Sequence, residues 1–225
     1  MQDVEKKWYQ YWWAKILLGI LFFILIILVA FGFYVYDTYK NLDKNQIPGS
    51  TYKNNKELGI KDNSNYWLGA TNPKITIYYY SDFACPICKS AYTKIKDVAK
   101  NYGQDVKIIV KDFLLHDESA DLALAARCAG EQGKFWLMHD MLFYKQGIKT
   151  EIELTSLAKD IGLDTTKFTQ CFDNKKYLPN IRQDFMEAQD LGLEGTPTWI
   201  IDGEIFSGDI PNNVLTNILN KKLNK

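Results

Sequence analysis

Two β-rich runs enclose a helix-patterned stretch that opens with a pair of cysteines. Both runs, residues 75–80 and 106–110, consist mostly of β-branched and aromatic residues, and between them apolar residues recur at a helical spacing over residues 87–98. Parallel strands need a crossover of about this length, so the pattern predicts a βαβ unit. The pair, Cys85 and Cys88, falls at the turn from the first strand into the helix.

The spacing of Cys85-Pro86-Ile87-Cys88 indicates dithiol and disulfide chemistry. Sulfurs in the first turn of a helix can close a small ring, and unpaired backbone N–H groups together with the helix dipole stabilise the outer sulfur as a thiolate. The thiolate is the form that attacks a disulfide. Pro86 suits this turn because its fixed φ fits the first helical position. Half of a zinc site has the same spacing, so metal binding is an alternative.

A run of 21 residues without a charge, Ile16 to Tyr36, precedes this unit. About 20 apolar residues suffice to cross a bilayer as a helix. The run is longer than the core of a cleavable signal, which favours a retained transmembrane anchor over residues 16–36, with cleavage after a signal near Ala30-Phe31-Gly32 as the alternative. Aromatic residues typical of membrane interfaces flank the run: Trp8, Tyr9, Tyr11, Trp12 and Trp13 before its centre, and Tyr34, Tyr36 and Tyr39 after it.

Lysines lie on both sides of this run, so counting positive charges does not decide its orientation. A short segment before a first span usually leaves a long following domain outside, and we therefore expect residues 1–15 to form a short cytoplasmic tail. Residues 37–67 are rich in Asn, Lys, Asp and Ser without a sustained apolar period, which predicts a polar tether. The remaining residues 68–225 have the size of one domain.

A block of helical patterns follows the second β-rich run. Apolar residues recur at helical spacings from about residue 117 to residue 192, and Gly162 and Gly192 stand where helices are expected to end. The two remaining cysteines, Cys128 and Cys171, lie on separate helices of this block. Four cysteines permit three pairings.

Strand patterns return near the C-terminus. Residues 198–201 and 204–207 flank Asp202-Gly203, which is a strong signal for a β-hairpin. A last helical stretch, residues 211–223, would cover one face of the sheet. The resulting order of strand, helix, strand, helical block, hairpin and helix is that of an α/β domain.

Several separated motifs add a family resemblance to this order. They are Leu68-Gly69, Tyr80-Ser81-Asp82-Phe83, Cys85-Pro86-Ile87-Cys88, the run from Ala125 to Trp136, and Gly195-Thr196-Pro197-Thr198. Together, over about residues 68–220, they resemble the DsbA family, in particular its membrane-anchored, BdbD-like branch. The resemblance implies an α/β thioredoxin fold with an inserted helical subdomain, here preceded by one N-terminal transmembrane helix.

The resemblance also implies roles for individual residues. Cys85 would be the nucleophile and the exposed end of a redox-active disulfide, with Cys88 as its buried partner. Thr196-Pro197 would form a cis-proline loop opposite the cysteine pair, where backbone groups receive an extended substrate segment. Some relatives carry a second bridge in their helical domain, which here would pair Cys128 with Cys171 and fit an oxidising compartment; two independently buried thiols are the alternative.

Two residues depart from the family pattern. Many oxidants of the family have a His before the second cysteine, whereas this chain has the uncharged Ile87, so we expect a less oxidising disulfide. The family's usual buried Glu is replaced by Tyr79, which leaves carboxylate-assisted proton transfer without its carboxylate. Asp82 is expected to act as a turn or helix-cap residue at least as much as an acid. Of the two histidines, His116 is expected on a surface loop and His139 as a satisfied residue of a packed helix.

We therefore expect an extracytoplasmic thiol-disulfide oxidoreductase that is held at the cell membrane by one span and donates its disulfide to exported proteins. The resemblance implies reoxidation by a DsbB- or VKOR-type membrane partner and no bound cofactor. A reductase or isomerase of the same fold, and a metal-binding or peptide-holding module, are the alternatives. The formal net charge is zero and the basic residues are nearly all lysines, which favours ordinary solvated lysines over a nucleic-acid surface.

Overall fold

The computed structural model describes residues 12–41, 51–52, 58–61 and 65–224. The chain divides into two units, Met1–Gln46 and Ile47–Lys225. In the first unit, helix α1 (Trp12–Asn41) contains the stretch Lys15–Tyr36, the one helix segment among the described residues that is long and apolar enough to span a membrane. The first eleven residues of the expected cytoplasmic tail lie outside the described residues.

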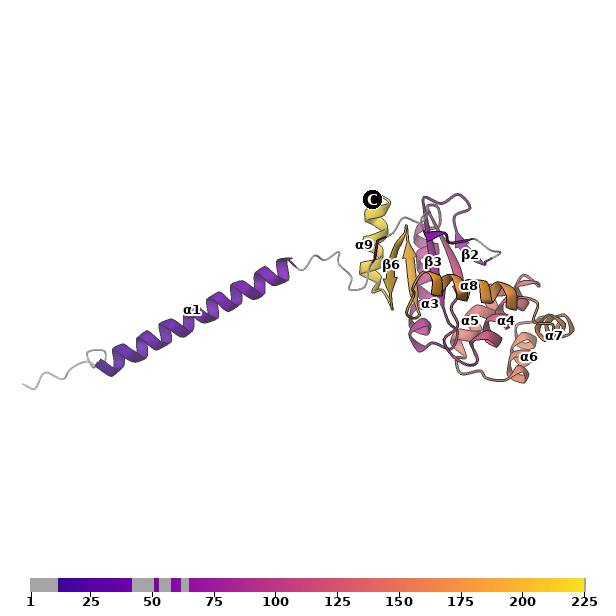
Figure 1. Cartoon of the computed structure of the whole chain (residues 1–225), viewed down its shortest axis with the longest axis horizontal. Coiled ribbons are helices and arrows are strands. Elements are labelled where there is room, and N and C mark those ends of the chain that lie inside the picture. The colour runs from indigo at the N-terminus through magenta and orange to yellow at the C-terminus, as the bar shows by residue number, and fades with distance from the viewer. Residues whose placement is uncertain (1–11, 42–50, 53–57, 62–64, 225) are drawn as a thin grey trace, which may run out of the picture. The chain divides into compact units, whose positions relative to one another are not determined.

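A six-stranded sheet forms the centre of the second unit (Figure 1). Its strands are β1 (Thr51–Tyr52), β2 (Trp67–Gly69), β3 (Ile75–Ser81), β4 (Val106–Asp112), β5 (Thr198–Ile201) and β6 (Glu204–Ser207). They lie in the order β1-β6-β5-β3-β4-β2, with β3 and β4 parallel and every other neighbouring pair antiparallel. Helix α3 (Pro86–Tyr102) crosses between β3 and β4, which confirms the predicted βαβ unit. Asp202 and Gly203 both have positive φ at the turn of the predicted hairpin.

One face of the sheet is covered by α3 and by the last helix, α9 (Asn212–Lys222). Ile77 and Tyr79 point to this face because alternate residues of β3 share a side, and both are fully buried. Ile95 of α3 and Leu219 of α9 pack in the same apolar cluster. Full burial of an aliphatic side chain of this size contributes about 1.5–3 kcal/mol, so this layer holds the start of α3 firmly against the sheet.

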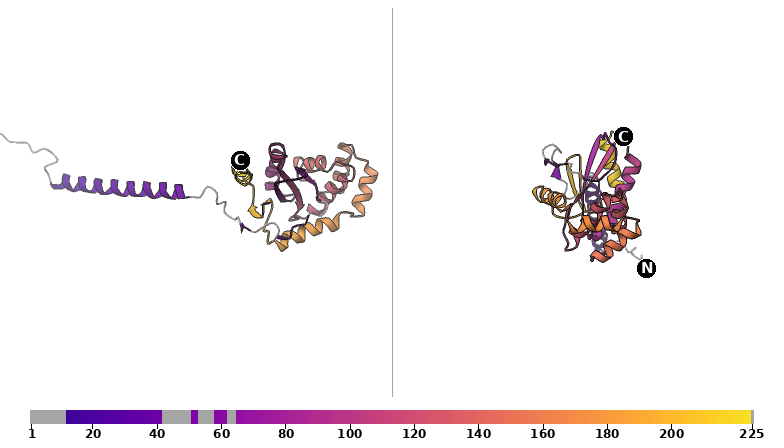
Figure 2. Two further views of the ribbon diagram at one scale, coloured as in Figure 1. Left: turned by 90° about the horizontal axis from the view of Figure 1, so that it is seen from above. Right: turned by 90° about the vertical axis from the view of Figure 1, so that its right-hand side faces the viewer.

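The opposite face is covered by α8 (Leu178–Asp190). Tyr80 and Ile200 point to this side and pack with Ala188 of α8, and all three side chains are fully buried. Figure 2 shows α8 leading back along the sheet from the other helices of the predicted helical block. The sheet is therefore a layer between helices on both faces, as expected for an α/β domain.

Four helices pack around a second core beyond one end of the sheet (Figure 1). They are α4 (Ser119–Gly130), α5 (Phe135–Tyr144), α6 (Glu151–Asp160) and α7 (Thr165–Asp173). Met138, Phe143 and Phe168 are completely buried in this core. Gly162 and Gly192, with φ of +73° and +69°, follow the ends of α6 and α8 and so confirm the predicted helix stops. With α8, these helices account for the insertion expected over residues 117–192.

A buried ion network joins β4 to α4 and α8. Lys111 Nζ lies 3.0 Å from Asp184 Oδ1 and 2.9 Å from Glu187 Oε1. Arg127 Nε lies 2.7 Å from Asp112 Oδ2, and its Nη2 lies 2.7 Å from Asp184 Oδ2. Three carboxylates thus share two cations, and of these five side chains the Glu187 carboxylate is the one most open to solvent. Burial and the neighbouring Asp112 raise the pKa of Asp184 from its ordinary 3.8 to about 6, against the opposing effect of the two cations.

Part of the segment predicted as a tether belongs to the folded domain. Strand β1 pairs with β6, Leu58 and Ile60 pack against the α8 face of the sheet, and Trp67 pairs with Ile109 of β4. The structure therefore differs from the predicted domain boundary at residue 68. Strands of two and three residues are too short to show a period, and neighbouring strands fix their pairing. Residues 42–50, 53–57 and 62–64 of the predicted tether lie outside the described residues.

Candidate active site

The loop between β3 and α3 places both free cysteines at the start of α3. Cys85 is the N-cap residue, with an extended backbone (φ −74°, ψ 121°), and Pro86 occupies the first helical turn. Proline fits there because the missing N–H has no helical partner to lose. The Cys88 backbone N–H donates to Cys85 Sγ at 3.5 Å. The sulfur of Cys85 therefore takes the capping place usually filled by a Ser, Thr, Asp or Asn oxygen, facing the positive end of the helix dipole.

The Cys85 sulfur also meets the loop before β5. Its Sγ donates to the Thr196 carbonyl oxygen at 3.4 Å, and the peptide bond between Thr196 and Pro197 is cis. Gln146, which follows α5, donates to the carbonyl oxygens of Phe83 and Cys85, both at 2.8 Å. Sequence reasoning did not find Gln146, because one polar residue in a loop gives no signal of its partners. Three separate parts of the domain thus meet at Cys85.

The two sulfurs differ in their access to solvent. They are free thiols, and the exposed fraction is 6% for Cys85 and 0% for Cys88. Burial raises the pKa of Cys88 to about 12, although the Thr196 and Ser81 hydroxyls act in the opposite direction. Cys88 is therefore a neutral thiol at neutral pH, and Cys85 is the sulfur that an attacking group can reach. The outer and inner positions are those expected, but Cys85 is much less exposed than "exposed end" implies.

Large apolar side chains lie on the surface near the cysteine pair. Ile87 is 53% exposed, so the residue between the cysteines presents an uncharged side chain to solvent. Leu115 and Tyr144 are also exposed. Their backbones are tied to the site, because the Leu115 N–H donates to Asp82 and the Tyr144 carbonyl accepts from Lys89 of α3. This surface suits contact with an unfolded or extended apolar chain.

Asp82 is a buried carboxylate that ties the cysteine turn to the loop after β4. It accepts from the backbone N–H groups of Ala84 and Leu115, each at 2.9 Å, and from the Ser119 hydroxyl at 2.7 Å. His116 is exposed on the loop after β4, as expected, and its Nδ1 lies 2.8 Å from Asp82 Oδ2, which ties it to the site. The bond to Ala84 bears out the expected turn role, while the other partners give Asp82 a long-range role that the sequence did not indicate.

Tyr79 occupies the position where the family resemblance led us to expect an acid. It is fully buried, and its ring packs against Trp199 with centroids 4.3 Å apart. Its hydroxyl has no hydrogen-bond partner among the described residues. Burial raises the pKa of this phenol well above its ordinary value, so the group is a neutral O–H donor.

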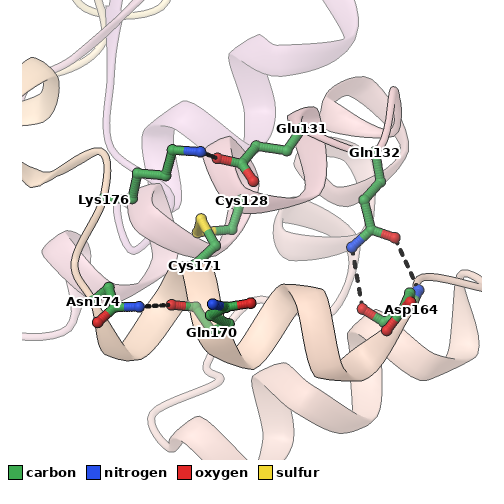
Figure 3. The surroundings of a disulfide bond; sticks show 8 residues. All are labelled: Cys128, Glu131, Gln132, Asp164, Gln170, Cys171, Asn174 and Lys176. Atoms are coloured by element: carbon green, nitrogen blue, oxygen red, sulfur yellow. Dashed lines mark hydrogen bonds and ion pairs between the residues drawn. A yellow bond between two sulfur atoms is a disulfide. The ribbon is translucent and has the colours of Figure 1, made fainter.

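A disulfide joins Cys128 of α4 to Cys171 of α7, with Cα atoms 5.8 Å apart. It lies within the core of the helical block, because both cysteines are almost fully buried. Neighbouring side chains make further contacts across the same helices: Lys176 pairs with Glu131, and the Gln132 amide exchanges hydrogen bonds with the Asp164 backbone at 2.9 and 3.1 Å (Figure 3).

His139 lies in an aromatic cage in the helical block. The rings of Phe83, Trp136 and Phe143 surround it at centroid distances of 5.1 to 5.4 Å. Its Nδ1 meets Asp140 at 3.3 Å, whereas its Nε2 has no partner among the described residues, so the expected satisfied histidine is satisfied at one nitrogen alone. Burial lowers its pKa, which keeps the ring neutral. Across the described part of the chain, no three His, Cys, Asp or Glu side chains are grouped to hold a metal ion.

Solved structures share this architecture. The thiol-disulfide exchange protein alpha-DsbA2 from Wolbachia pipientis superposes with a TM-score of 0.65 at 25% identity, covering 71% of this chain and 88% of that one. BdbD from Bacillus subtilis, in its oxidised form, superposes with a TM-score of 0.64 at 22% identity, covering 72% of this chain and 94% of that one. The likeness to BdbD is one of fold.

Sequence comparison adds a family. The Na(+)/H(+) antiporter NhaA of Herminiimonas arsenicoxydans is 26% identical over 151 residues, which are 67% of this chain and 24% of the antiporter. NhaA 1 of Mycobacterium sp. (strain KMS) is 31% identical over 145 residues, which are 62% of this chain and 24% of that protein. The chain thus spans about a quarter of the length of these curated relatives. The model of the thioredoxin family matches residues 61–221. The chain therefore belongs to the thioredoxin family.

Proposed function

We propose that this protein is a thiol-disulfide oxidoreductase that donates a disulfide from Cys85 and Cys88 to exported proteins. The observation that carries the proposal is the arrangement of Cys85: its sulfur caps α3, lies 3.4 Å from the Thr196 carbonyl oxygen, and is followed one turn later by a fully buried second thiol. The similarity to alpha-DsbA2, described as a thiol-disulfide exchange protein, supports the same chemistry.

Donation proceeds in two exchanges. A client thiolate attacks Cys85 Sγ of the oxidised pair, the bond between the two sulfurs breaks, and Cys88 leaves with the electron pair. A second client thiolate then attacks the client sulfur of the mixed disulfide, and the Cys85 thiolate leaves. The client loses two electrons and the protein gains them. The helix N-terminus favours a negative sulfur at Cys85, while the backbone of Thr196 lies where it can bond an extended client segment.

The cycle closes when another protein reoxidises the pair. We place the domain on the extracytoplasmic side of the cell membrane, anchored by residues 16–36, with a DsbB- or VKOR-type membrane oxidase as the partner. The apolar segment Lys15–Tyr36 supports the anchor. The disulfide between Cys128 and Cys171 supports an oxidising compartment, since such bridges persist outside the reducing cytosol.

The test uses the full chain in detergent micelles, equilibrated with thiol buffers of graded potential. We expect a reduction potential well above thioredoxin's value of about −270 mV, and a potential at or below that value contradicts the proposal. In cells, the Cys85 thiolate of Cys88→Ser attacks a disulfide of an exported protein and one client sulfur leaves as a thiolate; these mixed disulfides are expected to accumulate, because no Cys88 thiol is present to attack Cys85 and release the client. Cys85→Ser is the matched control and should accumulate none. A peptide-holding module would keep its activity in both variants.

A reductase is the second candidate, and Ile87 is the observation that favours it. This side chain is half exposed beside Cys85 and carries no charge that could stabilise the outer thiolate. The same potential measurement separates the two candidates, because a reductase needs a disulfide that is harder to reduce than those of its clients.

A further inference from the structure

Unpartnered buried hydroxyls gather around the inner cysteine. Five buried side-chain polar atoms lack a hydrogen-bond partner among the described residues, and three of them are the hydroxyls of Tyr79, Ser81 and Thr196. Tyr79 and Ser81 share one face of β3, the face that α3 covers, and Thr196 lies in the loop that contacts Cys85. The Ser81 and Thr196 hydroxyls lower the pKa of Cys88, and a negative charge on Cys88 raises the pKa of Tyr79, so the charge state of this sulfur is linked to all three residues.

Such a cluster requires an explanation, because the great majority of buried hydroxyls in folded proteins are bonded. Asp82, the buried carboxylate that follows Ser81 in the sequence, does not supply one. Asp82 is already occupied by the backbone of Ala84 and Leu115, by the Ser119 hydroxyl and by His116. A neutral thiol is a weak acceptor, and so the three O–H groups have no strong acceptor while Cys88 is protonated. A thiolate at the same place would be one.

We propose that the hydroxyls of Tyr79, Ser81 and Thr196 form a donor cradle that binds the thiolate of Cys88 when it forms. The inference rests on the proposed disulfide exchange. When a client thiolate bonds to Cys85 Sγ, the bond between the cysteines breaks and its electron pair stays on Cys88, which is fully buried. The three hydroxyls donate to this sulfur until it takes a proton from water. In the reverse direction they stabilise the thiolate that attacks the mixed disulfide at Cys85.

The test is a single-turnover reaction of the reduced full chain, in detergent micelles, with dithiobis-nitrobenzoate. Cys85 releases one nitrothiobenzoate in a phase whose rate depends on reagent concentration. Cys88 then attacks the mixed disulfide and releases the second, in a phase that does not. The bridged Cys128 and Cys171 do not react.

Tyr79→Phe and Ser81→Ala are each expected to slow the second phase about tenfold, the factor for one lost hydrogen bond to a charged group, and to leave the first phase unchanged. The rate of the second phase follows the thiolate fraction of Cys88. In both variants, the pH profile of this rate should therefore shift by about one pH unit toward alkaline pH relative to wild type. Tyr79→Phe removes a hydroxyl that has no hydrogen-bond partner among the described residues, so the fold should tolerate it, and Ser81→Ala provides a second measurement.

Matched controls are Tyr78→Phe, one residue earlier on the other face of β3, and Ser90→Ala, whose hydroxyl bonds Asp209 at the exposed side of α3. Both should behave like the wild type. A second phase within about twofold of wild type in both cradle variants overturns the cradle, and so does an equal slowing of both phases, which would report a general disturbance of the site. A different result contradicts the proposed function, namely a low reduction potential of the wild-type protein. That result would leave the comparison of the two reaction phases, and so the test of the cradle, unaffected.

Discussion

Replacing Asp184 by Asn is expected to change how the stability of the domain depends on pH. The buried network around Asp184 holds three carboxylates and two cations, a net charge of −1, so one excess proton is favoured there. Asp184→Asn keeps the shape of the side chain and removes the group whose pKa is raised. It also leaves Lys111 and Arg127 with one acceptor fewer, a cost that does not vary with pH between about pH 4 and pH 8.

The sign follows from proton binding. The pKa of Asp184 is about 6 in the folded protein against 3.8 ordinarily, so between these values the folded state binds more protons than the unfolded state. Stability of the wild type therefore falls as pH rises through this window and is constant above it. The difference between 6 and 3.8, at 1.36 kcal/mol for each pH unit, amounts to about 3 kcal/mol.

The assay is urea unfolding of the full chain in detergent micelles from about pH 4 to pH 7, followed by the fluorescence of the buried Trp199. Relative to wild type, Asp184→Asn should gain most of this difference, roughly 2 to 2.5 kcal/mol, between pH 4 and pH 7, whatever its constant penalty. Asp173→Asn, at an exposed carboxyl of α7, is the control and should show no such gain. A difference between Asp184→Asn and wild type that is flat with pH, or that moves in the opposite sense, refutes the reasoning from net charge.

Three further predictions concern the cysteines and Tyr79. Replacing Cys128 and Cys171 together by Ala should lower the free energy of unfolding by about 4 kcal/mol, because the bridge closes a separation of 43 residues; an effect below about 1 kcal/mol in urea unfolding would contradict it. Tyr79→Phe should raise the stability of the reduced protein by about 1 kcal/mol, since it removes a buried hydroxyl without a partner, and a loss of stability by the same method would count against this. Brief alkylation of the reduced protein at pH 8 should label Cys85 alone, because Cys88 has no exposed surface and a pKa of about 12; peptide mass spectra showing equal labelling would be the contrary result.

Local patterns predicted much of this fold. The alternation in residues 75–80 indicates the central strand because one of its faces carries the core, and Asp202-Gly203 indicates a hairpin because few residues other than Gly, Asn and Asp accept positive φ. The neighbours of the cysteine pair alone predict that it stands at a helix start, and α3 begins there. Each of these signals depends on residues that are close in sequence.

Features that depend on distant residues could not be predicted. From its sequence neighbours, Lys111 does not differ from a solvated lysine, but its partners Asp184 and Glu187 come from α8, and no local pattern joins them. For the same reason, the sequence does not predict that the Ser81 and Thr196 side chains both act on Cys88. Strand β1 gave no signal because it has two residues and takes its place from β6. Sequence patterns record which face of an element is apolar, but not which polar group lies opposite.

The strand order has a consequence for how a client chain can approach. Strands β1 and β2 lie at the two edges of the sheet, and they have two and three residues. A long edge offers a row of unpaired N–H and C=O groups to which another extended chain can add, whereas edges this short offer almost none. Under the proposed function, an unfolded client would therefore bind at the end of the sheet where Cys85 and the Thr196 carbonyl lie, and not by adding a strand to a sheet edge.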